Sequence, residues 1–118
     1  MENQIYVDVE SALRLIRGNK KLYHRMLGMF LASEDYLALE ESLAAGDNER
    51  SAHLAHSIKG VTGNLSMTPL FEVSMQLMLE LRQGSADAAT IEKYRQVLVA
   101  TQDQVRIVMA DLEAEGFA

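Results

Sequence analysis

Residues 86–115 read ADAATIEKYRQVLVATQDQVRIVMADLEAE and contain the longest regular pattern in the chain. One row of apolar residues recurs every seven positions, and a second row lies between its members; the two rows are Ile91, Leu98, Val105 and Leu112, and Tyr94, Thr101 and Val108. Steps of three and four keep both rows on one side of an α-helix. The pattern therefore predicts a helix over 86–115 whose apolar seam packs against several other helices.

The chain before this segment divides into shorter helical segments. Apolar residues at helical spacing predict helices over about 8–17, 19–45, 48–66 and 69–83, and no stretch alternates as a strand would. Glycine follows four of the five predicted helices, at Gly18, Gly46, Gly84 and Gly116. Glycine takes the left-handed conformation of a helix C-terminus at little cost, so these residues indicate where the helices end.

Capping residues and loop lengths define the architecture. Asp8 and Asp47 are good N-caps, and Thr68 before Pro69 is expected to cap the fourth helix. Within 19–45 two apolar rows are expected to face one core, with a possible bend at Ser33, Glu34 and Asp35; the rows are Leu22, Met29, Tyr36 and Leu43, and Tyr23, Phe30, Leu37 and Ala44. Because short connections make consecutive helices antiparallel, we predict an all-α fold, an up-down-up-down four-helix bundle with a short additional N-terminal helix.

Composition excludes several classes of protein. A chain of 118 residues fits one domain over 1–118, and without cysteine it has no thiol nucleophile, disulfide or thiolate metal site. The net charge of −6 has the wrong sign for a nucleic-acid-binding protein. No apolar run approaches the roughly 20 residues of a membrane span, and the first ten residues carry acids where a signal peptide carries bases. We therefore expect a soluble, cytoplasmic, monomeric protein without membrane contact.

The predicted helix over 48–66 has two chemically different faces. At roughly 100° per residue, Leu54, Ile58, Val61 and Leu65 cluster on one side and are expected to face inward. His56 points away from them, with Glu49, Ala52, Gly60 and Gly63 on its own side and His53, Lys59 and Asn64 farther round. The projection predicts an exposed imidazole surrounded by small residues.

Two glycines inside a helix require an explanation, because each costs roughly 0.8 to 1 kcal/mol relative to alanine. The structural explanation is close approach of another helix of the same bundle, or a frayed helix end. Gly60 and Gly63 lie away from the apolar stripe, which favours instead an incoming partner that needs access to His56.

An exposed imidazole suits phosphoryl chemistry. Imidazole has an ordinary pKa of about 6.5, so much of it is neutral and nucleophilic near neutral pH, and it can leave again after reacting. Phosphoryl transfer also needs positive charge near the oxygens, which Lys59, three residues after His56, could supply. A solvated surface pair is the ordinary interpretation of such a spacing, and the glycines argue against it.

Other site chemistries fit less well. Glu49, His53 and His56 could share a metal ion, but carboxylate di-iron bundles hold Glu-x-x-His ligands inside the core from two helices, and the motif does not recur here. We therefore expect no metal. No Gly-x-Ser-x-Gly elbow and no phosphate-binding glycine loop with lysine occurs, so no nucleotide site is expected.

The segment AHSIKGVTGNLS, residues 55–66, resembles the His-x-x-Lys-Gly signature of histidine-containing phosphotransfer (HPt) domains of bacterial phosphorelays. The resemblance extends from about Asp8 to Gly84. It implies that His56 is the phosphoacceptor, that Lys59 neutralises the phosphoryl group and that Gly60 admits the partner, with Gly63 and Asn64 also at familiar positions.

The resemblance also implies partners and cofactors. Response-regulator receiver domains would exchange the phosphoryl group between their aspartate and His56, and a hybrid sensor histidine kinase would be a further partner. The chain would be a carrier and not a kinase, with Mg²⁺ supplied by the receiver and no cofactor of its own. The alternative is a helical bundle of the same fold that binds a partner without phosphoryl transfer.

Overall fold

A computed structural model describes residues 4–117. Over these residues the chain forms six α-helices and no strand, which confirms the all-α prediction. The helices are α1 (Val9–Leu15), α2 (Lys20–Ala32), α3 (Asp35–Ala44), α4 (Asn48–Asn64), α5 (Thr68–Arg82) and α6 (Ala88–Glu115).

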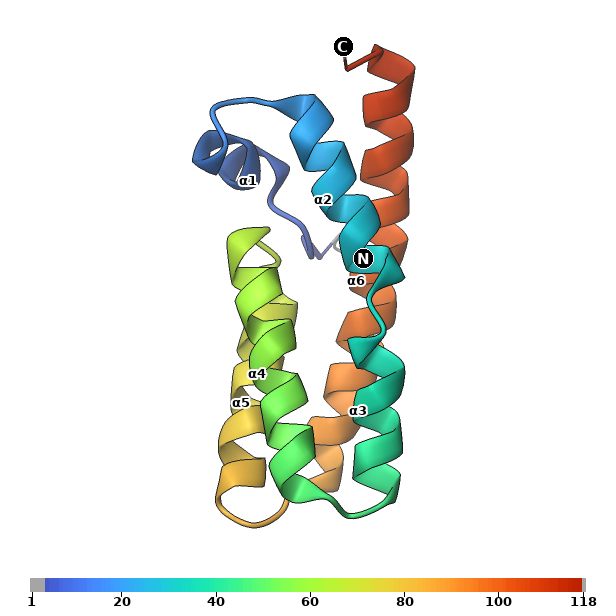
Figure 1. Cartoon of the computed structure of the whole chain (residues 1–118). Helices are drawn as coiled ribbons and strands as arrows, with labels where there is room; N and C mark the ends of the chain where they lie inside the picture. The colour runs from blue at the N-terminus through green and yellow to red at the C-terminus, as the bar shows by residue number, and fades with distance from the viewer. Residues whose placement is uncertain (1–3, 118) are drawn as a thin grey trace.

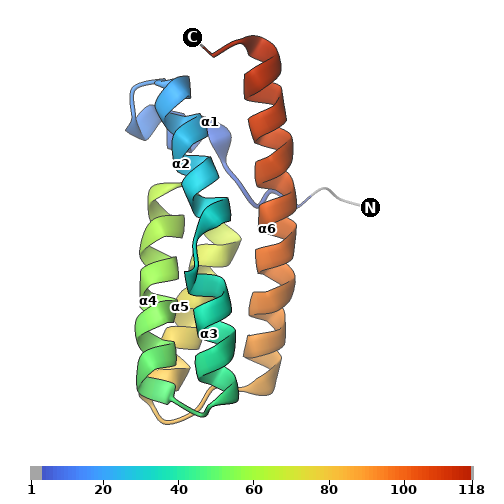
Figure 2. The same cartoon turned by 45° about the vertical axis from the view of Figure 1, so that its right-hand side comes forward.

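The helices form a bundle in which α2 and α3 together make one of four rods. The hairpin α4–α5 is one half of the bundle, and α6 runs first beside α3 and then beside α2 along the other half (Figures 1 and 2). A bidentate ion pair between Arg95 and Glu40, with a shortest N···O distance of 2.8 Å, links α6 to α3. Helix α1 lies across the end of the α4–α5 hairpin, where the amide of Asp8 donates to the carbonyl of Ser66 at 3.0 Å.

The prediction of one continuous helix over 19–45 is wrong, because the helix breaks at Ser33 and Glu34. Ser33 has an extended backbone, and its Oγ accepts a hydrogen bond from the amide of Asp35 at 3.2 Å. The hydroxyl of Tyr36 donates to the carbonyl of Phe30 at 2.6 Å, which satisfies one of the carbonyls freed at the end of α2. The break disrupts the two predicted rows.

The helix boundaries agree with the predicted glycines and N-cap residues, except at the start of α5. Gly18, Gly46, Gly84 and Gly116 all have positive φ angles, as a left-handed helix end requires. Asp8 and Asp47 accept hydrogen bonds from the amides three residues later, which confirms both caps. The predicted Thr68 cap is wrong: the N-cap of α5 is Met67, whose side chain cannot accept such a bond and is instead fully buried in the core.

Most of the predicted seam of α6 forms the core. The buried members are Tyr94, Leu98, Thr101, Val105 and Leu112. Met29 and Leu37, in contrast, were predicted to be buried and are each 67% exposed. They lie on either side of the break between α2 and α3, where the seven-residue spacing no longer keeps a row on one face.

Candidate functional site

Helix α4 carries the exposed histidine on a well-supported frame. The carboxylate of Asp47 accepts the amide of Arg50 at 3.1 Å and so fixes the start of the helix. Ser51, at the first turn, shares a 2.6 Å hydrogen bond with Ser42 of α3, and the whole length of α4 lies beside α5. The histidine therefore stands on a helix held from two sides.

The side chain of His56 is exposed at the middle of α4, as the helical projection predicts. Among residues 4–117, its imidazole takes part in no hydrogen bond or ion pair, in contrast to His24, which pairs with Glu113 at 2.7 Å. Both ring nitrogens are therefore available to an incoming group.

The inward face of α4 differs from the predicted one. Leu54, Ile58 and Leu65 are buried as predicted, but Val61 is 43% exposed. Ala52, placed by the projection on the side of His56, is only 6% exposed. The inner face of α4 includes the small buried residues Ser51, Ala52 and Ala55, because α3 and α5 approach α4 closely there. A prediction of the inner face from large apolar residues alone does not include them.

The two helix glycines have different surroundings. A Cβ added to Gly60 would meet no atom within 4 Å, so the space beside His56 is open. A Cβ added to Gly63 would lie 3.2 Å from the ring of Phe71 on α5. The prediction that neither glycine serves packing inside the bundle is therefore wrong for Gly63, which gives the Phe71 ring room.

The other predicted site residues lie around His56 on the same helix. Lys59 is half-buried, and its ammonium forms no ion pair with any carboxylate in the described part of the chain. His53 and Asn64 are exposed. His53 is one turn before His56 and Asn64 is two turns after it, so these side chains form one polar surface with the open space at Gly60 between them.

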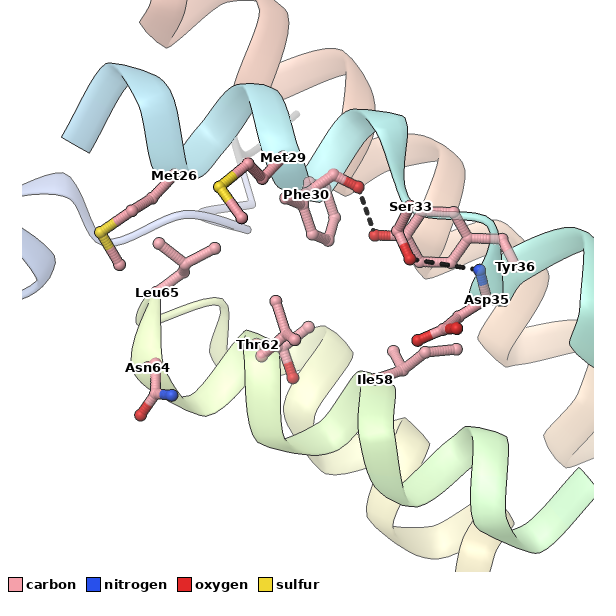
Figure 3. Close-up of a pocket in the computed structure, with 11 residues that line it drawn as sticks. Met26, Met29, Phe30, Ser33, Asp35, Tyr36, Ile58, Thr62, Asn64 and Leu65 are labelled. Carbon is pink, nitrogen blue, oxygen red and sulfur yellow. Dashed lines mark hydrogen bonds between the residues drawn. The ribbon is translucent and has the colours of Figure 1, made fainter. Parts of the chain in front are cut away.

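A cavity of about 360 Å³ lies on the flank of α4 that faces α2, and sequence reasoning did not predict it. The thioethers of Met26 and Met29 point from α2 toward Thr62 of α4 and toward Leu65, the residue that follows α4 (Figure 3). At the end opposite Met26 the cavity is lined by Asp35 and Tyr36, just beyond the helix break. Burial, reinforced by the negative charge of Asp35, raises the pKa of Tyr36 above its ordinary value. The feature of the sequence that could have indicated this cavity is Ser33, where the apolar pattern of residues 19–45 is interrupted.

Residues 4–117 contain neither a cluster of metal ligands nor a membrane-spanning helix. No group of three or more His, Cys, Asp or Glu side chains there could hold a metal ion. Similarly, no helix in this range has the length and apolar character needed to cross a membrane.

Comparison with known families identifies one match. The family model described as the Hpt domain matches residues 25–115, which is more than three-quarters of the chain and includes His56, Lys59 and Gly60. Comparisons with curated proteins and with solved structures found no match.

Proposed function

The chain belongs to the Hpt domain family, and from this premise we propose that His56 carries the phosphoryl group. Hpt domains are phosphoryl carriers in phosphorelays, not kinases, and they interact with receiver domains. The observation that carries the proposal is an exposed imidazole at the middle of α4, with no hydrogen-bond or ion-pair partner among residues 4–117, next to open space at Gly60.

The reaction is a reversible transfer between a carboxylate and an imidazole. The lone pair of the unprotonated ring nitrogen of His56 attacks phosphorus in the acyl phosphate of a receiver aspartate. A P–N bond forms, the P–O bond to the aspartate breaks, and its electron pair returns to the carboxylate. The other ring nitrogen keeps its proton throughout. Such a transfer requires the acceptor to be positioned in line with the breaking bond, which a fixed helix supplies.

Labelling by a phosphorylated receiver domain tests the proposal. Receivers of the source organism, phosphorylated chemically and freed of the small phosphodonor, are mixed with the chain. We expect one receiver at least to transfer a label that is lost in acid and stable in base, as a phosphoramidate should be, and that maps to the peptide containing His56. An unlabelled chain after exposure to every receiver would contradict the proposal and favour a partner-binding bundle without transfer.

Lys59 is proposed to neutralise the phosphoryl oxygens. Its ammonium is three residues from His56 and has no ion-pair partner among the described residues, so it is free to reach a group on the ring. Lys59→Ala is expected to slow transfer by about tenfold, since a charge-assisted hydrogen bond to the moving group is lost. The measurement is the initial rate of label transfer from a fixed receiver.

The control for this variant is Lys93→Ala, which removes an exposed charge from α6. One half-exposed charge contributes little to stability, so the unfolding temperature of Lys59→Ala should match that of the unchanged chain. Equal rates for the Lys59 and Lys93 variants, or loss of the fold in the former, would remove this role for Lys59.

A further inference from the structure

We propose that a basic pocket at one end of the bundle binds an acidic peptide segment of a partner protein. The pocket lies where α2 begins and α6 ends, two places that meet at the same end of the bundle (Figures 1 and 2). It is lined by residues of 19–25 and by Phe117, so it lies apart from the surface of α4 that carries His56. The inference adds a second binding surface to the chain and does not depend on phosphoryl transfer.

The first observation is an uneven distribution of charge along the chain. Residues 11–33 contain five of the 11 lysines and arginines and none of the 17 acidic residues, although the chain as a whole has a net charge of −6. Three of these five cations, Lys20, Lys21 and Arg25, lie in the first two turns of α2. The start of α2 is therefore a local positive surface on an acidic protein, and it attracts negatively charged groups.

The second observation is that the end of α6 already binds to this surface. The carboxylate of Glu115 lies 2.8 Å from the ammonium of Lys20, and the carboxylate of Glu113 lies 2.7 Å from Nε2 of His24. The ring of Phe117 stacks on the imidazole of His24, with a centroid distance of 4.6 Å and an interplanar angle of 19°. The start of α2 thus holds two carboxylates and an aromatic ring from the same chain, which is the chemistry of an acidic peptide with an apolar side chain.

Two cations of the same surface are left for a partner. Lys21 and Arg25 are exposed and form no ion pair with any residue in 4–117. They are four residues apart and therefore neighbours on one face of α2, where two like charges repel each other. A carboxylate from another protein would remove this repulsion, and the planar guanidinium of Arg25 can hold a carboxylate through two parallel hydrogen bonds.

The lining of the pocket favours a peptide over other anions. The pocket has a volume of about 500 Å³, and its lining combines three basic side chains, one amide and two apolar side chains. The lining residues are Asn19, Lys21, Leu22, His24, Arg25 and Phe117. Inorganic phosphate would use only the charges, and a nucleic acid would meet the 17 acidic residues along its length. An acidic peptide with an apolar side chain among its carboxylates uses both parts of the lining.

The test measures the fluorescence anisotropy of a fluorescein-labelled peptide in which glutamates flank a pair of leucines. We expect saturable binding that added salt weakens, because salt screens exposed ion pairs. For the double variant Lys21→Ala/Arg25→Ala, the dissociation constant should rise about fivefold, since two exposed ion pairs are lost. The matched control is Arg50→Ala/Lys93→Ala, which removes the same two kinds of side chain from exposed positions of α4 and α6. It should change the dissociation constant by less than about twofold.

A third variant tests the apolar part of the pocket. Phe117→Ala should weaken binding of the leucine peptide more than binding of the same peptide with serines in place of the leucines. The absence of saturable binding, an equal loss for the Arg50/Lys93 control, equally tight binding of duplex DNA, or displacement of the peptide by an equal concentration of inorganic phosphate would each overturn the inference. His56→Gln should bind the peptide as tightly as the unchanged chain, so failure of phosphoryl transfer would leave this pocket intact. Circular dichroism of each variant verifies that the bundle is folded.

Discussion

Replacing His56 with glutamine is expected to reduce phosphoryl transfer to the background rate. Glutamine keeps a polar side chain of similar length at an exposed helix position but offers no nitrogen lone pair that can attack phosphorus. Since the His56 side chain bonds to no other described residue, its removal should leave the free energy of unfolding within about 0.5 kcal/mol of the original. Radiolabel transfer from the receiver and urea unfolding of the same preparation measure the two quantities.

The matched control is His53→Gln, one turn away on the same exposed surface of α4. It removes an imidazole of the same chemistry from a neighbouring position, so transfer to this variant should continue at a rate close to the original. Label that persists in the His56 variant and disappears in the His53 variant would show that the acceptor is His53. Label lost from both variants would indicate that the two imidazoles act together.

Local sequence signals predicted most of the fold. The helix ends at Gly18, Gly46, Gly84 and Gly116 depend on the backbone freedom of glycine, and the seam of α6 depends on a spacing that any helix imposes. The break at Ser33 depends instead on a competition between one more helical turn and a set of side-chain bonds. The bond from Tyr36 back to Phe30 closes only after the chain has turned, so periodicity could suggest a bend but not an end.

The exposure of His56 was predictable, but the orientation of its helix was predicted only in part. Exposure followed from the large apolar residues on the other side of α4. The burial of Ala52 and the exposure of Val61 depend on how closely α3 and α5 approach, which is set by small residues that a hydropathy pattern weights little. The same limitation applies to Gly63, because its neighbour Phe71 is on another helix. The cavity beside α2 depends on three elements at once and was not predicted.

Replacing Gly60 with leucine is expected to slow transfer by roughly 100-fold while making the bundle more stable. The site is open at the backbone, since a Cβ at this position meets nothing within 4 Å. We therefore expect the added side chain to extend into solvent and to strain no contact within the bundle. Leucine is a better helix former than glycine, and the free energy of unfolding should rise by about 0.5 to 1 kcal/mol. The same side chain would stand where the receiver must approach His56, and a displacement of even 1 Å at the reacting atoms has a large effect on rate. Transfer rates and urea unfolding of one preparation measure both effects.

Two further variants identify the cause of the slower transfer. Ala110→Leu places the same leucine side chain at an exposed position of α6 and should leave the transfer rate unchanged, since that helix lies away from α4. Gly63→Ala should stabilise the bundle less than Gly60→Ala, because the new methyl group would press on the Phe71 ring at 3.2 Å. A normal rate for Gly60→Leu would mean that the receiver does not approach over this glycine. Equal gains in stability for the two alanine variants would mean that the Phe71 ring moves aside freely and that Gly63 is not required for packing.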